Sequence, residues 1–169
     1  TVSVVNTAPP GLPAYAVTDR AAAIYMWSPG SDVLEARKPD TRTLDLNINE
    51  KWKKFAGSKS IPYLGVAAHT KWVNEHPTLV PKLYNAYKAA ADWTLAHPDE
   101  ASKLIEPKGT AESQKAIAAL IRANDRLGMS ITWASDVKKE LDLIYKIGLD
   151  VDILPKVPTT KTFYDGPRQ

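Results

Sequence analysis

Short apolar runs separated by turn residues fill the first third of the chain, and this pattern predicts alternating strands and helices. Thr1–Asn6 is a β-branched run that ends at a Pro-Pro-Gly turn, and the apolar run 21–27 is broken by Ser-Pro-Gly. Residues 11–20 between them have room for one short helix. Strand, helix and strand in this order form the unit that builds parallel sheets. The pattern therefore predicts an α/β fold with a strand-rich first third.

Two further strands are expected before the pattern changes. Thr41–Leu46 alternates between apolar and polar residues, and Ile61–Ala68 has the composition of a strand. A short helix is predicted between them, over Asn49–Phe55. No strand is expected after Ala68.

Helical periodicity governs the rest of the chain. A helix that starts at Pro77 and ends near Ala96 carries an apolar stripe at three- and four-residue spacing. Further helices are expected over 99–105, over 110–124 with Thr110 as N-cap, and from Ser135 or Asp136 to a stop at Gly148. Residues 155–169 are expected to form an extended surface tail. The C-terminal part is thus predicted to be mainly helical.

The composition excludes some kinds of chemistry but does not indicate a function. The chain has 169 residues, enough for one domain with its own core, and it has no cysteine, which excludes disulfides and thiolate chemistry. The net charge of +3 is spread along the sequence. Its densest basic cluster, Lys51, Lys53 and Lys54, stands among Trp52 and Phe55. The cluster has two readings, a nucleic-acid patch or the solvated face of an amphipathic helix, and we favour the second.

Catalytic and metal-binding motifs are missing from the sequence. The three histidines, His69, His76 and His97, lack metal-ligand spacing, and there is no glycine-rich phosphate loop or Gly-x-Ser-x-Gly elbow. We expect no catalytic residue, no metal and no cofactor.

No apolar run reaches the length of a membrane span, and the N-terminus has no signal-peptide pattern, so any signal peptide is expected to have been removed or never to have been part of this chain.

The segment 25–30 contains the best candidates for ligand binding. Tyr25 and Trp27 are two residues apart and would point to the same side of a strand, at the end where open α/β sheets bind ligands. Ser28 and free backbone N–H groups after it would hold an anionic group. An equally open alternative is that Trp27 packs in a core and Ser28 only caps a helix. The other tryptophans, Trp52, Trp72, Trp93 and Trp133, are expected to have packing roles.

Several segments, in their order along the chain, resemble the nitrate, sulfonate and taurine type of ABC-transporter substrate-binding proteins, a group that includes thiamine-precursor binders. These segments are Asp19-Arg20-Ala21-Ala22-Ala23-Ile24-Tyr25-Met26-Trp27-Ser28-Pro29, the strand Tyr63–Ala68, the helix starts His76-Pro77 and His97-Pro98-Asp99-Glu100-Ala101, and the helix end Ile147-Gly148-Leu149. The family's strand has the form Asp-Ala-Ala-x-x-Trp-x-Pro, and here the acidic residue is displaced.

The resemblance implies a type II periplasmic-binding fold, in which two α/β lobes close on a ligand. Residues 1–60 would then belong to the second lobe and 61–154 to the return strand and helices of the other lobe, with Tyr63 as a fourth ligand-binding candidate. The implied function is the solute-binding component of an ABC importer, periplasmic or extracellular, which partners a membrane permease and binds no nucleic acid. Family members are nearly twice as long, so the opening elements of the first lobe are expected to be missing, and exposed sheet edges would then favour a dimer.

Three alternatives remain at this point. An enzyme of the same fold, the pyrimidine synthase of thiamine biosynthesis, relies on a cysteine-rich motif that this chain lacks. A ligand-sensing domain of a transcription regulator and a non-binding interaction module are the other two. The ligand stays open, because aromatic side chains suit sulfonates, carboxylates and pyrimidines alike.

Overall fold

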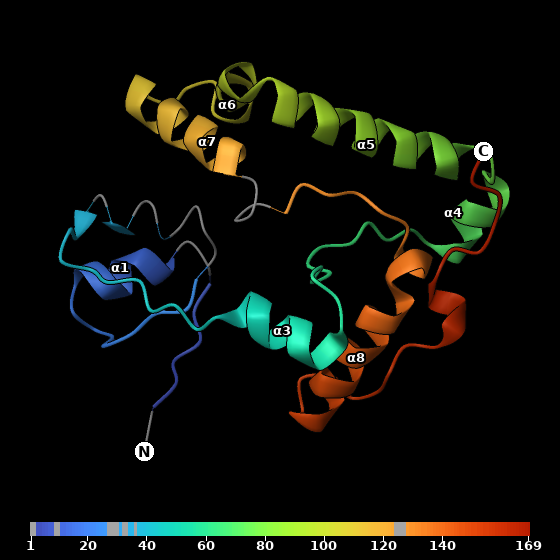
Figure 1. Ribbon diagram of the computed structural model, residues 1–169, viewed down its shortest axis with the longest axis horizontal. Helices are drawn as coiled ribbons and strands as arrows, with labels where there is room; N and C mark the ends of the chain where they lie inside the picture. Colours follow the sequence, from blue (N-terminus) through green and yellow to red (C-terminus); the bar gives the residue numbers. More distant parts are fainter. Residues whose placement is uncertain (1–2, 9–10, 27–30, 32–33, 36, 124–127) are drawn as a thin grey trace. The chain divides into compact units, whose positions relative to one another are not determined.

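The computed structural model describes residues 3–8, 11–26, 31, 34–35, 37–123 and 128–169 (Figure 1). The chain divides into two units, Thr1–Leu46 and Asn47–Gln169. The described residues form helices joined by irregular segments, and no strand occurs among them. The predicted α/β architecture of the type II periplasmic-binding kind, with a strand-rich first third, is therefore wrong for this structure. The lobe boundaries predicted after residues 60 and 154 stay a prediction.

The segments predicted as strands fail to become strands because none of them is paired. A strand forms only where its backbone N–H and C=O groups meet those of a neighbouring strand, and no such ladder joins the described parts of these segments. Their apolar side chains are exposed as well, Leu44 over 79% and Leu64 over 87% of its surface. Apolar, β-branched composition favours a strand only where a partner and a packed face exist.

The first unit contains the short helix α1, Leu12–Val17 (Figure 1). The Thr18 hydroxyl donates to the carbonyl oxygen of Ala14 at 2.7 Å and closes the end of this helix. Lys38 forms an ion pair with Asp19, and this hydrogen bond raises the pKa of Lys38. Leu34 is buried. The predicted turns at residues 9–10 and 28–30 lie outside the described residues.

The helices of the second unit follow the predicted periodicity closely. They are α3 (Ile48–Ala56), α4 (Thr70–Glu75), α5 (Leu79–Ala96), α6 (Pro98–Ile105), α7 (Ala111–Ala123) and α8 (Lys138–Asp150), with 3-10 turns η2 (Ala134–Val137) and η3 (Thr160–Thr162). Thr110 caps α7 as predicted, since its hydroxyl accepts from the Ser113 N–H at 3.1 Å. The short helix α4 was not predicted, and α5 begins two residues later than expected, at Leu79 rather than Pro77.

Gly148 does not end the last helix, as the sequence had suggested, but lies inside α8. The chain turns back over it, and the N–H groups of Ile153 and Leu154 both donate to its carbonyl oxygen, at 2.8 and 2.9 Å. A Cβ atom at this position would lie 2.9 Å from Leu154 Cδ1. The glycine therefore permits a close approach of the returning chain.

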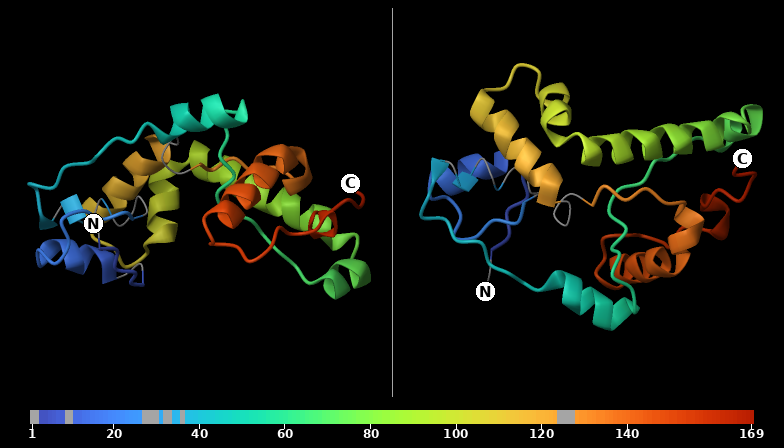
Figure 2. Two further views of the ribbon diagram at one scale, coloured as in Figure 1. Left: turned by 90° about the horizontal axis from the view of Figure 1, so that it is seen from below. Right: turned by 45° about the horizontal axis from the view of Figure 1, so that its top comes forward.

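The best-buried part of the second unit lies between α6 and α7, which pack against each other (Figure 2). Its buried residues are Ala101, Ser102, Ala118, Leu120 and Ile121. The alanines let the two helices approach closely, and Ile121, only 1% exposed, is the largest fully buried side chain among the described residues. The helix α5 contacts both partners and buries Ala91. This small core holds the three helices together.

A second cluster joins α5 to the C-terminal residues through stacked rings. Trp133 stacks on Tyr84 of α5 with ring centroids 4.2 Å apart and planes inclined by 12°. It also stacks on Tyr164, at 5.6 Å and 22°. Pairs of this geometry stabilise a fold beyond the area that they bury. The stack therefore fastens residues 155–169, the predicted tail, to the helical part of the unit.

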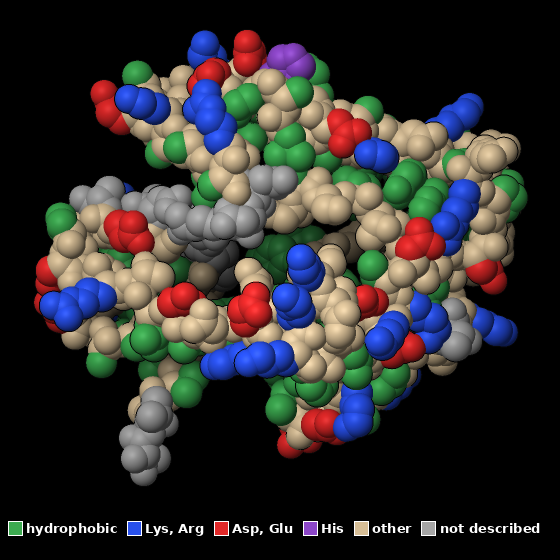
Figure 3. Space-filling view, in the orientation of Figure 1, with side chains coloured by type: hydrophobic (Ala, Val, Ile, Leu, Met, Phe, Trp, Pro, Cys, Tyr) green, Lys and Arg blue, Asp and Glu red, His purple; other side chains and the backbone are tan. Residues whose placement is uncertain are grey.

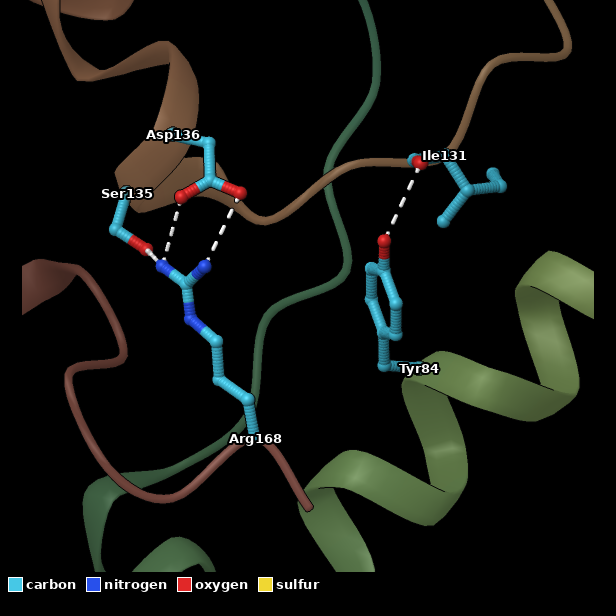
Figure 4. A network of polar contacts seen from close by, with 5 residues as sticks. All are labelled: Tyr84, Ile131, Ser135, Asp136 and Arg168. Atoms are coloured by element: carbon cyan, nitrogen blue, oxygen red, sulfur yellow. Dashed lines mark hydrogen bonds and ion pairs between the residues drawn. The ribbon is translucent and has the colours of Figure 1, made fainter.

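A polar network reinforces this attachment (Figure 4). The Arg168 guanidinium donates to both carboxylate oxygens of Asp136, at 2.8 and 3.2 Å, and to the Ser135 hydroxyl at 2.8 Å. It also lies 5.4 Å from the centroid of the Trp133 ring, within cation–π distance. The Tyr84 hydroxyl donates to the carbonyl oxygen of Ile131 at 3.4 Å.

We expect the substitution Ile121→Ala to lower the free energy of unfolding by about 2 to 4 kcal/mol, because it opens a cavity in the core between α6 and α7. Urea denaturation followed by far-UV circular dichroism measures this. The matched control is Lys115→Ala on the exposed side of α7, which should change the stability by less than about 0.5 kcal/mol. Equal effects of the two substitutions would contradict the core described above.

The substitution Trp133→Ala should release the C-terminal residues without unfolding the helices, because it removes two ring stacks and a cation–π contact. We expect trypsin to cleave after Lys156 and Lys161 about tenfold faster. Limited proteolysis with mass spectrometry measures the rates, and Trp72→Ala serves as the control. An unchanged rate after Trp133→Ala would show that the tail is held by other contacts.

Candidate functional site

The four residues predicted to bind a ligand are only partly covered by the described chain. Trp27 and Ser28 lie outside the described residues. Tyr25, in the first unit, is 90% exposed, and Tyr63, in the second, is 76% exposed. Neither tyrosine ring contacts another ring in the parts of the chain that the structure describes. Both rings are thus available to a ligand or partner.

Tyr63 is carried by the irregular segment between α3 and α4, and one contact fixes the start of that segment. The Trp52 indole N–H, on the buried side of α3, donates to the carbonyl oxygen of Ser60 at 2.8 Å. Beyond this point Leu64 and Val66 are exposed together with Tyr63. An amphipathic ring on an otherwise apolar, exposed segment is a common anchor for ligands and partners.

The Arg168 network is a contact within the fold rather than an anion site. Its guanidinium already donates to Asp136 and Ser135, and the Asp136 charge neutralises it. A guanidinium held in this way by a carboxylate has little capacity left for a second anion. The two stacked tyrosines likewise occupy the Trp133 ring. We therefore assign this cluster to the attachment of the C-terminal residues.

The remaining tryptophans pack as expected. Trp52 is buried, Trp72 contacts the His76 ring at 5.5 Å, and Trp93 stacks on His97 at 4.9 Å. The His97 Nδ1 atom lies 2.9 Å from the carbonyl oxygen of Trp93, one turn earlier. These histidines therefore close helix ends, next to the prolines that follow them.

The described residues offer no cluster of metal ligands. No group of three His, Asp or Glu side chains among them is close enough to hold a metal ion. The Lys88 ammonium donates to Asp92, and this hydrogen bond raises the pKa of Lys88. The pair lies on the exposed surface of α5, and none of the candidate site residues belongs to this helix.

None of the described helices combines the length and the apolar character that a membrane crossing requires.

The basic cluster lies on a solvent-exposed side of α3, and the absence of nucleic-acid binding stays a prediction. Lys51, Lys53 and Lys54 are exposed, whereas Trp52 is buried with its indole N–H bonded to Ser60. Burial of Trp52 removes one of the two rings that stand among these lysines, because stacking on bases needs exposed rings. Sequence reasoning missed that Phe55 stays 58% exposed beside these lysines. Residues 51 and 55 are four positions apart and lie on the same side of a helix, so this spacing could have predicted that Phe55 is exposed beside Lys51.

Comparison with known proteins identifies a family for the chain. Residues 1–101 match the model of the family described as NMT1/THI5 like, whereas no curated protein and no solved structure matches significantly. The matched range covers more than half of the chain and includes Tyr25, Trp27, Ser28 and Tyr63. The chain therefore belongs to the NMT1/THI5-like family, the family of the nitrate-, sulfonate- and taurine-type ABC substrate-binding proteins that its sequence resembles.

Proposed function

We propose that this chain acts in the solute-binding component of an ABC importer and contacts a small anion or heterocycle. The observation that carries the proposal is the family match over residues 1–101. Membership of this family indicates a solute-binding role in ABC transport and a small-molecule ligand, and its members are generally not enzymes. The specific ligand and the role in import belong to the proposal.

Tyr25, Trp27, Ser28 and Tyr63 are the residues that we propose to contact the ligand. All four fall in the matched range. The exposure of Tyr25 and Tyr63 supports the choice, because a large ring that is 90% or 76% exposed has most of its faces free. Binding sites for small molecules combine such rings with a few polar groups that fix orientation. The Ser28 hydroxyl is the polar group proposed here.

The proposed ligand class follows from these side chains. Aromatic rings stack on flat heterocycles and cover the apolar part of an organic acid, while a hydroxyl donates to a sulfonate, carboxylate or nitrate oxygen. Alkyl and aromatic sulfonates, aromatic carboxylates, nitrate and pyrimidines are therefore the compounds to test.

The proposed setting is outside the cytoplasm. Family members are typically periplasmic or extracellular, and in general they deliver their ligand to an ABC permease. We propose the same location and the same kind of partner for this chain. Dimerisation, which the sequence analysis expected through exposed sheet edges, stays a prediction that size-exclusion chromatography with light scattering tests.

A thermal-shift screen of the chain against these compounds tests the proposed function. A compound at a hundredfold its dissociation constant should stabilise the folded chain by about 2.7 kcal/mol, because it binds only the folded state. We expect Trp27→Ala to abolish the shift, and Tyr63→Ala to weaken binding about tenfold through loss of one ring contact.

Two substitutions serve as matched controls, Trp93→Ala for the tryptophan and Tyr87→Ala for the tyrosine. Both rings lie on α5 and are partly exposed, and neither is a proposed ligand contact. Stabilisation that the controls retain and Trp27→Ala removes would support the site. If no compound stabilises the chain, the function moves to a ligand-sensing or interaction module.

A further inference from the structure

The helix α3 (Ile48–Ala56) presents an exposed face that combines lysines with large apolar side chains. Residues 48, 51 and 55 are three and four positions apart and therefore lie on one side of the helix. Ile48 is 53% exposed and Phe55 58% exposed. Lys51 lies between them, and Lys54 continues the same side three residues later. We call Ile48, Lys51, Lys54 and Phe55 the α3 face.

Buried contacts next to the α3 face fix this orientation. Trp52 and Ala56 are buried, and Trp52 donates its indole N–H to Ser60. Gly57 ends the helix in the left-handed conformation, with φ of 68°, and its N–H donates to the carbonyl oxygen of Lys53 at 3.0 Å. The Phe55 ring contacts the Trp52 ring, with centroids 6.1 Å apart, and is still 58% exposed.

The lysines of the α3 face have no acidic partner among the described residues, whereas four helix lysines elsewhere in the second unit do. On α4, α5 and α8, lysines pair with a carboxylate four residues later, as in Lys71–Glu75, Lys88–Asp92, Lys138–Asp142 and Lys146–Asp150. Lys51, Lys54 and the neighbouring Lys59 form no ion pair with any described residue, and α3 has one acidic residue, Glu50, in its first turn. Lysine and arginine side chains gather over α3 and the loop after it (Figure 3).

A second helix adds positive charge to the same region. The ammonium nitrogen of Lys139, on α8, lies 3.9 Å from the position that a Cβ atom would take at Gly57. Lys139 is exposed and has no ion pair in the described chain either. Lys139 therefore adds a lysine without a carboxylate partner next to the C-terminal end of α3.

We propose that the α3 face binds an anionic lipid surface. Unpaired lysines are attracted to the phosphates of acidic headgroups, while exposed Ile48 and Phe55 enter the boundary between headgroups and acyl chains. A short helix with basic and apolar side chains on one side makes both kinds of contact when it lies flat on the lipid surface. The proposal concerns residues outside the ligand site and stands independently of the proposed solute-binding function.

A nucleic-acid partner fits the same face less well. Single-stranded binding uses several exposed rings on which successive bases stack, and burial of Trp52 leaves Phe55 as the one exposed ring of α3. The aliphatic side chain of Ile48 has no role in contacts with a phosphate backbone. A lipid surface, in contrast, contacts both apolar side chains, Ile48 and Phe55.

Vesicle co-sedimentation of the chain tests the proposal, with phosphatidylcholine vesicles that contain or lack about one-third phosphatidylglycerol. We expect binding to the anionic vesicles alone, weakened by added salt. The double variant Lys51→Gln/Lys54→Gln should bind about thirtyfold more weakly, which corresponds to about 1 kcal/mol for each lysine. Phe55→Ala should weaken binding about fivefold through loss of apolar insertion.

The matched control is Lys82→Gln/Lys115→Gln, which removes two exposed lysines without ion pairs from α5 and α7 and gives the same net charge. Circular dichroism establishes that each variant keeps its helices. The proposal is overturned if the wild-type chain ignores anionic vesicles, or if the control loses as much binding as the α3 variant. It is also overturned if a single-stranded oligonucleotide binds through Lys51 and Lys54 while the vesicles do not.

Discussion

Close packing of α6 against α7 is the contact on which the second unit depends. Ala101 and Ala118 are small enough for the two helices to approach, and Ile121 fills the space that remains. The buried Ser102 hydroxyl costs little, because it donates to the carbonyl oxygen of Asp99 at 2.9 Å, one turn earlier. The core is therefore built from small side chains and one large one. Such a core tolerates little change in volume.

The C-terminal residues depend on weaker contacts of a different kind. Trp133, Tyr164 and Arg168 are all partly exposed, so each stack or ion pair among them contributes on the order of 1 kcal/mol or less. Together these contacts hold the C-terminal residues against α5 and η2, but each contact alone is weak enough for thermal fluctuations to break it. The second unit thus has a tightly packed helical part and a more easily released end.

The helices were predictable because their signals are local. Thr110 caps α7 through its own side chain, and His97-Pro98 separates α5 from α6 by rules that involve only neighbouring residues. Ile61–Ala68 failed as a strand because a strand also needs a partner strand, and none of the described residues pairs with it. Gly148 was misread for a similar reason, since the approach of Leu154 is invisible in the local sequence. At the candidate site, the sequence indicated Tyr25 and Tyr63, whose rings are exposed, whereas Trp27 and Ser28 lie outside the described residues.

Trp52 connects the two surfaces to which we assign functions. Its indole N–H holds the carbonyl group of Ser60 and thereby fixes the start of the segment that carries Tyr63. Its burial also turns α3 so that Lys51 and Phe55 face outward. Loss of this one side chain would disturb both surfaces at once. Only substitutions at exposed positions, such as Tyr63 on one surface and Lys51 on the other, can therefore separate ligand binding from lipid binding.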